Sequence, residues 1–148
     1  MKTKINLEKE GRTVLFVSAH PDDPEFRGCG LAALCSRRGD KVFIMSVTDG
    51  SGGHMTMGKM EAAARREKEA ERSAAIIGAT ALCMGAPDGC LEPSLKYREE
   101  LIRIIRKLEP DIIVTNRLND YHPDHRYTAQ LIQDASYMLM VPNVVSYT

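Results

Sequence analysis

Two short clusters of histidine and aspartate are the residues of this chain best suited to chemistry. They are His20-Pro21-Asp22-Asp23 and His122-Pro123-Asp124-His125, and they contain three of the four histidines in the sequence. Each cluster follows an apolar run that predicts a β-strand. Imidazole and carboxylate groups at the ends of two strands can bind a metal ion and transfer protons. The pattern therefore indicates a metal-dependent hydrolase.

The spacing within the clusters predicts three metal ligands. His20 and Asp23 are three residues apart across a tight turn, so their side chains can share one ion, and His125 supplies a third ligand from the second cluster. A catalytic zinc ion has three protein ligands and one open position for water. Fe²⁺ suits the same ligands. The alternative is that these histidines lie on the surface or make ordinary hydrogen bonds.

The other members of the clusters predict proton transfer. Asp22 is adjacent to a ligand and cannot easily share the same ion, but it is well placed to act as a general base toward water. His122 can stabilise an oxyanion or protonate a leaving amine, with Asp124 holding its tautomer or raising its pKa. Alternatively, Asp22 only forms the turn before a helix, and His122 is an ordinary loop residue.

Four apolar, β-rich runs alternate with helical patterns along the chain. The predicted strands are residues 13–19, 41–48, 79–84 and 111–115. The predicted helices are residues 25–38, 59–77, 95–108 and 125–140, with Ser94 as an N-cap. This order predicts an α/β fold, a Rossmann-like three-layer α/β/α sandwich on a mainly parallel sheet.

In such sheets, ligands bind beyond the carboxyl ends of the strands. Both clusters follow predicted strands, as do the glycine-rich loop that begins at Asp49 and the loop around Asp88, so all four are expected to meet. A dinucleotide site is disfavoured, because Gly28-Cys29-Gly30 does not form GxGxxG. The first strand-to-helix turn also carries two aspartates, which would repel a pyrophosphate.

The composition limits the class of protein. The 148 residues predict a single domain, residues 1–148, whose net charge of zero disfavours nucleic acid and anionic membranes as partners. No run approaches the roughly 20 apolar residues of a membrane span, and the N-terminus lacks a signal-peptide core. The four cysteines have no CxxC spacing, which is typical of reduced thiols in a cytoplasmic protein. A homo-oligomer is compatible with the sequence.

The two clusters resemble the motifs of the LmbE-like (PIG-L) zinc deacetylases, the superfamily of the N-acetylglucosaminyl-phosphatidylinositol de-N-acetylases. The family's first motif, Ala-His-Pro-Asp-Asp-x-Glu, matches residues 19–25, and its second, His-Pro-Asp-His, matches residues 122–125. Between them the family has an Arg-x-x-Glu helix that ends in a glycine, matched by Arg66, Glu69 and Gly78.

This resemblance implies a role for each matched residue. Arg66 is implied to reach the substrate and Asp88 to bind sugar hydroxyls, while Glu25 buttresses the first loop. The implied metal ligands and proton-transfer residues are those that the spacing suggests: His20, Asp23 and His125 for zinc, and Asp22, His122 and Asp124 for catalysis.

The implied reaction is hydrolysis of an N-acetyl group on a small GlcNAc-type substrate, giving acetate and a free amine. The first hypothesis is therefore a zinc-dependent de-N-acetylase acting on a linear amide. A second is a truncated, non-catalytic metal- or sugar-binding domain of the same fold, and a third is hydrolysis of a different amide. Family members usually continue well past the second motif, so this chain is expected to be a fragment or a reduced domain lacking the family's C-terminal part. His54 is expected to face solvent.

Overall fold

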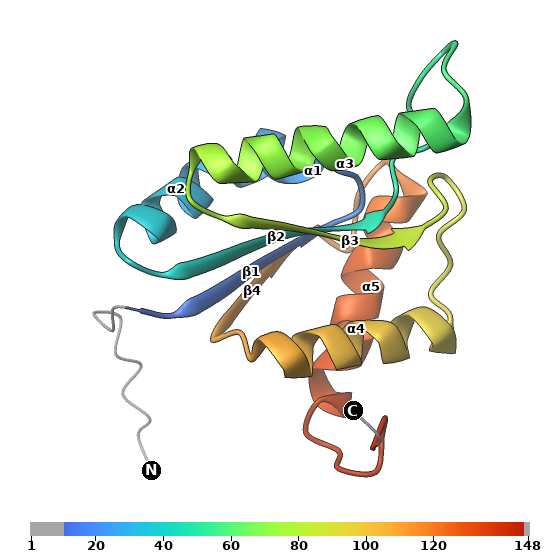
Figure 1. Cartoon of the computed structure of the whole chain (residues 1–148). Helices are drawn as coiled ribbons and strands as arrows, with labels where there is room; N and C mark the ends of the chain where they lie inside the picture. The colour runs from blue at the N-terminus through green and yellow to red at the C-terminus, as the bar shows by residue number, and fades with distance from the viewer. Residues whose placement is uncertain (1–10, 147–148) are drawn as a thin grey trace.

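Residues 11–146, which the computed structural model describes, form one parallel sheet with helices on both faces. The strands are β1 (Thr13–Ser18), β2 (Lys41–Thr48), β3 (Thr80–Ala86) and β4 (Ile112–Thr115), in the spatial order β3-β2-β1-β4. The helices are α1 (Asp23–Arg27), α2 (Cys29–Arg37), α3 (Lys59–Ile76), α4 (Leu95–Leu108) and α5 (Pro123–Met138). Helices α1, α2 and α3 cover one face, and α4 and α5 cover the other (Figure 1). The predicted three-layer α/β fold is confirmed.

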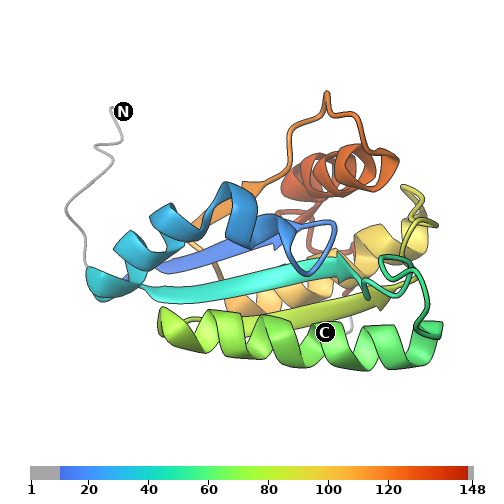
Figure 2. The same ribbon diagram turned by 90° about the horizontal axis from the view of Figure 1, so that it is seen from above.

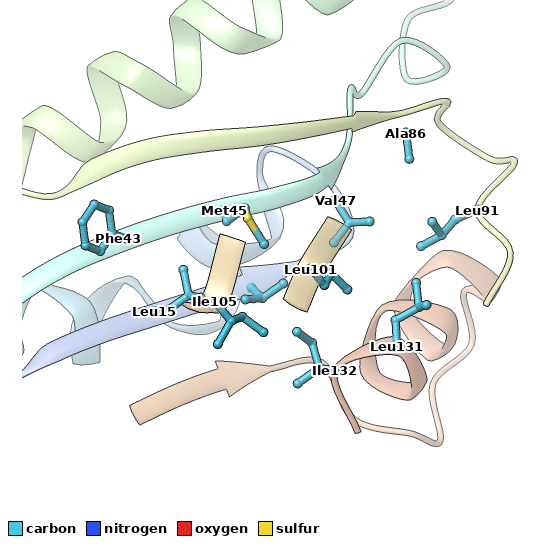
Figure 3. Packing of buried hydrophobic residues seen from close by; sticks show 11 residues of the cluster. Leu15, Phe43, Met45, Val47, Ala86, Leu91, Leu101, Ile105, Leu131 and Ile132 are labelled. Atoms are coloured by element: carbon cyan, nitrogen blue, oxygen red, sulfur yellow. The ribbon is translucent and has the colours of Figure 1, made fainter. Parts of the chain in front are cut away.

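Alternate residues of the two central strands supply two separate cores. Leu15, Val17, Met45 and Val47 point toward α4 and α5, where they pack with apolar residues of both helices (Figure 3). Val14, Phe16, Val42 and Ile44 point the other way, toward α2 and α3. A strand presents successive side chains to opposite faces, so a run that is apolar throughout is buried on both. The continuous apolar runs of β1 and β2 therefore place them at the centre of the sheet.

The predicted helix at residues 25–38 is in fact two helices, which meet at Gly28. A Cβ atom at Gly28 would lie 3.2 Å from the ring of Phe16 on β1, so the chain approaches the sheet closely at this residue. The backbone of Gly28 leaves the helical region there, with φ at −135°. The ends of the other elements differ from the prediction by at most two residues, and the Ser94 hydroxyl accepts a hydrogen bond from the N–H of Tyr97, as an N-cap should.

Helix α4 offers a direct test of the core. Leu101 is completely buried, whereas Leu95 is 60% exposed at the first residue of the helix. Leu101→Ala is expected to lower the free energy of unfolding by about 2–5 kcal/mol, because it leaves a cavity. Leu95→Ala is the matched control and should change it by less than about 0.5 kcal/mol. Urea denaturation of both variants measures the difference, and equal effects would contradict the assignment of Leu101 to the core.

Asp40 ties the end of α2 to the start of β1. Its buried carboxylate accepts hydrogen bonds from the backbone N–H of Arg12 and the Nε of Arg38, both at 3.0 Å. Burial would raise the pKa of Asp40, but the hydrogen bond from Arg38 and the bond from the Arg12 backbone hold it below its usual value.

This lowered pKa predicts a pH-dependent contribution to stability. A carboxyl group with a lowered folded-state pKa stabilises the protein above its unfolded pKa of about 4, and this contribution is lost as the pH falls through the folded value. Asp40→Asn is therefore expected to destabilise the protein most at neutral pH, with the gap to wild type closing on acidification. Urea midpoints of both proteins over an acid pH series measure the gap. A constant gap would contradict the prediction.

All four cysteines are free thiols: Cys29, Cys35, Cys83 and Cys90. Within residues 11–146, none of the helices combines the length and the apolar character needed to cross a membrane.

Candidate active site

The two clusters meet at the carboxyl ends of β1 and β4, which are neighbours in the sheet. His20 lies two residues beyond β1, and His125 lies in the first turn of α5, which follows β4. Figure 2 shows the loops that follow the strands gathered at the arrowhead end of the sheet. Parallel pairing brings together residues that are about a hundred positions apart in sequence, as expected for a ligand site in a fold of this kind.

His20, Asp23 and His125 form a triangle of close contacts. Nδ1 of His20 lies 3.3 Å from Oδ2 of Asp23 and 3.2 Å from Nε2 of His125, and that Nε2 lies 3.2 Å from Oδ1 of Asp23. Atoms bound tetrahedrally at about 2.0–2.1 Å from one zinc ion lie about 3.3 Å from one another. Each pair in the triangle has the spacing of two ligands of one ion, with Asp23 facing His20 through Oδ2 and His125 through Oδ1.

The other edge of the His20 ring faces two more carboxylates. Its Nε2 lies 3.2 Å from Oδ1 of Asp88 and 3.3 Å from Oδ2 of Asp124. Both carboxylates are held by the backbone: Asp88 accepts the N–H of Gly52 at 2.9 Å, and Asp124 accepts the N–H of Gly89 at 2.8 Å. An N–H on Nε2 can donate to either carboxylate, which leaves the Nδ1 lone pair of His20 directed at Asp23 and His125.

The charge of this cluster favours a cation. Burial would lower the pKa of His20, but its hydrogen bond to Asp23 and the nearby charges of Asp88, Asp23 and Asp124 raise it. For Asp23 the directions are reversed: burial would raise the pKa of this carboxyl group, but its hydrogen bonds with His20 lower it. Three carboxylates around one imidazole carry a surplus of negative charge, which a proton or a metal ion can balance.

Two further combinations of residues could also hold an ion. Among the described residues, His20, His122 and His125 can place one ligand atom each within 4.8 Å of one another, and so can His20, Asp88 and Asp124. His20 is common to both sets and to the triangle with Asp23. The cluster thus provides more candidate ligand atoms than one tetrahedral ion needs.

Asp22 lies beside the triangle but points to a different partner. Its Oδ2 accepts a hydrogen bond from Arg66 at 2.5 Å, and Arg66 also donates to Glu69 at 3.1 Å. Burial would lower the pKa of Arg66, but the charge of Asp22 and the hydrogen bonds to Glu69 and Asp22 raise it. Arg66 and Glu69, matched as a pair in the sequence, thus hold the carboxylate of Asp22 in place. The Asp22 side chain remains about half exposed to the cavity.

His122 is fixed by the start of helix α5, which it caps. Its Nδ1 accepts the backbone N–H of Asp124 at 3.2 Å, so a neutral His122 carries its proton on Nε2. Burial and the neighbouring charge of His20 lower the pKa of His122, although Asp124 opposes this. The sequence suggested that the carboxylate of Asp124 holds the tautomer of His122. In the structure the backbone of Asp124 does so, and its carboxylate lies against His20 instead.

Apart from the buried Asp124, the residues described above open onto one cavity of about 720 Å³. It is lined by the first cluster, by His122 and His125 of the second, and by Asp88, Arg66, Phe26, Met57 and Tyr121. Gly50 brings the loop after β2 onto the first cluster: its φ is +67°, and a Cβ there would lie 2.9 Å from the ring of Pro21. His54 also lines the cavity; it is exposed as expected, and its Nδ1 accepts hydrogen bonds from its own loop.

A family model described as GlcNAc-PI de-N-acetylase (PIG-L) matches residues 15–136, which is most of the chain and includes both clusters. The chain belongs to the PIG-L family. The resemblance seen in the two motifs is thereby confirmed.

Proteins similar to this chain differ in their stated reactions. A probable N-acetyl-α-D-glucosaminyl L-malate deacetylase of Bacillus anthracis is 32% identical over 86% of this chain and 60% of its own length. A 4-oxalmesaconate hydratase of Pseudomonas putida is 26% identical over 90% of this chain and 55% of its own. The solved N,N'-diacetylchitobiose deacetylase of Pyrococcus horikoshii has a TM-score of 0.86 and 30% identity, and the match covers 91% of this chain and 53% of that one. The chain thus spans little more than half the length of these PIG-L proteins.

Two residues that contact the site were missed by the sequence reasoning. The side chain of Asp120 is completely buried, and its Oδ1 lies 3.0 Å from Nδ1 of His125. Arg27, one turn of α1 beyond Asp23, donates to Asp120 at 3.0 Å. Burial would raise the pKa of Asp120, but its bonds with His125 and Arg27 hold it well below the usual range. Only the position of Asp120, two residues before the second PIG-L motif, could have drawn attention to it.

Proposed function

We propose that this protein is a zinc-dependent hydrolase that removes the N-acetyl group from a small N-acetylated sugar. The observation that carries the proposal is the triangle of His20, Asp23 and His125 in the lining of a cavity onto which Asp22 also opens. Membership of the PIG-L family supports deacetylation. The sugar is supported by the names of two relatives, a glucosaminyl malate deacetylase and a diacetylchitobiose deacetylase.

In this proposal, His20, Asp23 and His125 hold the metal. Their mutual distances and the surplus of negative charge around His20 support this assignment. Bound zinc supplies Lewis-acid chemistry, polarising an amide carbonyl and making water a stronger acid. Fe²⁺ is the alternative ion for this set of ligands.

Asp22 is the general base. Its carboxylate takes a proton from the attacking water while the water oxygen bonds to the carbonyl carbon of the acetyl group. The hydrogen bond from Arg66 fixes the direction of the carboxylate and balances its charge before the reaction. The same proton then reaches the nitrogen of the amide as the carbon–nitrogen bond breaks, which releases acetate and a free amine.

His122 stabilises the negative charge that develops on the carbonyl oxygen. Because its Nδ1 accepts the N–H of Asp124, a neutral His122 presents an Nε2–H donor on the cavity side. A donor held in place before the reaction stabilises an oxyanion without having to reorganise. Asp124 supports the site through its contacts with His20 and Gly89.

Arg66 and Asp88 are the proposed substrate contacts. Arg66 lines the cavity between Asp22 and Glu69, so any bond that it makes to a substrate must be shared with these carboxylates. Asp88 also lines the cavity, with one oxygen held by Gly52 and the other close to His20. A sugar hydroxyl that donates a hydrogen bond to Asp88 would therefore lie close to the triangle of His20, Asp23 and His125.

The proposal is tested by measuring the metal content of freshly purified protein together with acetate release from a panel of N-acetylglucosamine conjugates. We expect one zinc ion per chain and metal-dependent acetate release that stops on chelation and resumes on adding zinc. Protein that binds zinc but releases no acetate from any member of the panel would favour the alternative of a non-catalytic metal- or sugar-binding domain.

The hydratase among the relatives supports a second candidate, the addition of water to a carbon–carbon double bond. Such a reaction also needs a base to activate water, so Asp22 would serve both. The two candidates are distinguished by their products: an unsaturated carboxylate substrate loses its ultraviolet absorbance on hydration and yields no acetate. A panel that includes both substrate classes decides between them.

A further inference from the structure

The carboxylate of Asp120 is enclosed by groups that all donate or can donate hydrogen bonds. Its Oδ1 lies 3.0 Å from Nδ1 of His125 and accepts the backbone N–H of His122 at 3.4 Å. Its Oδ2 accepts bonds from Arg27 at 3.0 Å and from Arg117 at 3.1 Å. The side chain is completely buried, in the loop between β4 and α5.

Nδ1 of His125 has two neighbours of opposite character. Asp120 is an acceptor at 3.0 Å, and the NH2 group of Arg27 is a donor at 3.1 Å. A neutral imidazole carries one proton, so Nδ1 can donate to Asp120 or accept from Arg27, but not both. If it donates, the lone pair of Nε2 is free, 3.2 Å from both His20 and Asp23. If it accepts, Nε2 carries the proton and cannot bind a metal.

Asp120 decides between these tautomers. An ionised carboxylate beside an unprotonated Nδ1 would place two lone pairs against each other, whereas an Nδ1–H gives a charge-assisted hydrogen bond. When Nδ1 carries the proton, Arg27 loses its hydrogen bond to His125 but keeps the one that its NH1 group donates to Asp120.

We propose that Asp120 is a positioning residue that holds His125 in the tautomer whose Nε2 can bind the metal. This rests on the proposed function, in which His125 is a ligand. Histidine ligands commonly donate their second N–H to a carboxylate, and loss of such a partner typically lowers metal affinity by about 10- to 100-fold.

Asp120→Asn tests the proposal with almost no change of shape. The two arginine donors at Oδ2, at 3.0 and 3.1 Å, outweigh the single longer bond of 3.4 Å from the His122 N–H at Oδ1, so we expect the amide to keep its oxygen on the arginine side and turn its NH2 group toward His125. That NH2 group donates to Nδ1 and forces the proton onto Nε2. We expect the zinc affinity, measured by competition with a chromophoric chelator, to fall by about 10- to 100-fold. In metal-free protein at mildly alkaline pH, ¹⁵N NMR should show His125 changing from the Nδ1–H to the Nε2–H form.

Two further variants separate positioning from general stability. Asp40→Asn is the matched control: Asp40 is also a buried carboxylate bonded by two arginine residues, and within residues 11–146 its hydrogen bonds come from these arginines and not from a histidine. Its replacement should leave zinc affinity and the His125 tautomer unchanged. Arg27→Gln removes the competing donor and leaves the acceptor, so the Nδ1–H form should persist.

The results separate this proposal from the proposed function. Unchanged zinc affinity and an unchanged tautomer in Asp120→Asn would overturn the role of Asp120 alone. An Nε2–H form of His125 in the metal-free wild type would also overturn it, even if no Asp120 variant folds. Wild-type protein that binds no zinc would instead overturn the proposed function, and this role with it.

Discussion

Asp22→Ala is expected to lower the rate of amide hydrolysis by about 10²–10⁴-fold while the protein keeps its zinc. Asp22 is the carboxylate next to the proposed ligand triangle, and its side chain accepts a hydrogen bond from Arg66. Its loss therefore removes the acceptor for the proton of water without removing a ligand. The measurement is the initial rate of acetate release, paired with the zinc content of the same sample.

Two companion variants make this result specific. Asp22→Asn keeps an oxygen that can accept the hydrogen bond from Arg66, yet it cannot take up a proton, so it should be nearly as inactive as Asp22→Ala. Glu71→Gln removes an exposed carboxylate from the same helix as Arg66 and should leave the rate unchanged. A fully active Asp22→Ala would show that the base is another group.

His20→Ala is expected to abolish both zinc binding and hydrolysis. Among the described residues, His20 belongs to both ligand sets and to the triangle with Asp23, and its ring contacts Asp23, His125, Asp88 and Asp124. Its removal leaves carboxylates facing each other with neither a ligand nor a positive charge between them. Zinc content by elemental analysis is the measurement, with circular dichroism to verify that the variant is folded.

The fourth histidine provides the matched control. His54 is exposed, and its Nδ1 accepts hydrogen bonds from its own loop, so His54→Ala should keep its zinc. Asp23→Asn and Asp88→Asn then distinguish the ligand sets. The first should lose zinc and the second should retain most of it if Asp23 is the ligand. The reverse result would assign the ion to His20, Asp88 and Asp124, and full zinc content in His20→Ala would contradict all of these sets.

Most of the fold could be predicted because each strand and helix is determined mainly by the residues within it. Continuous apolar runs are buried on both faces of a parallel sheet, and helices between them are long enough to cross from one strand to the next. The exception is the helix broken at Gly28. Its break depends on a contact with Phe16, a residue on a different element, which no helical pattern contains.

The sequence alone determined the chemical types in the site and their arrival at one edge of the sheet. It did so because each cluster directly follows a strand, and parallel strands end at the same edge. Only the tertiary structure decided which partner each carboxylate meets: Asp124 lies against His20, Asp120 against His125, and Asp22 against Arg66. These pairs depend on the register between strands and on how each helix packs against the sheet. Side-chain directions across a gap of tens of residues follow from that packing, not from the spacing of residues within a motif.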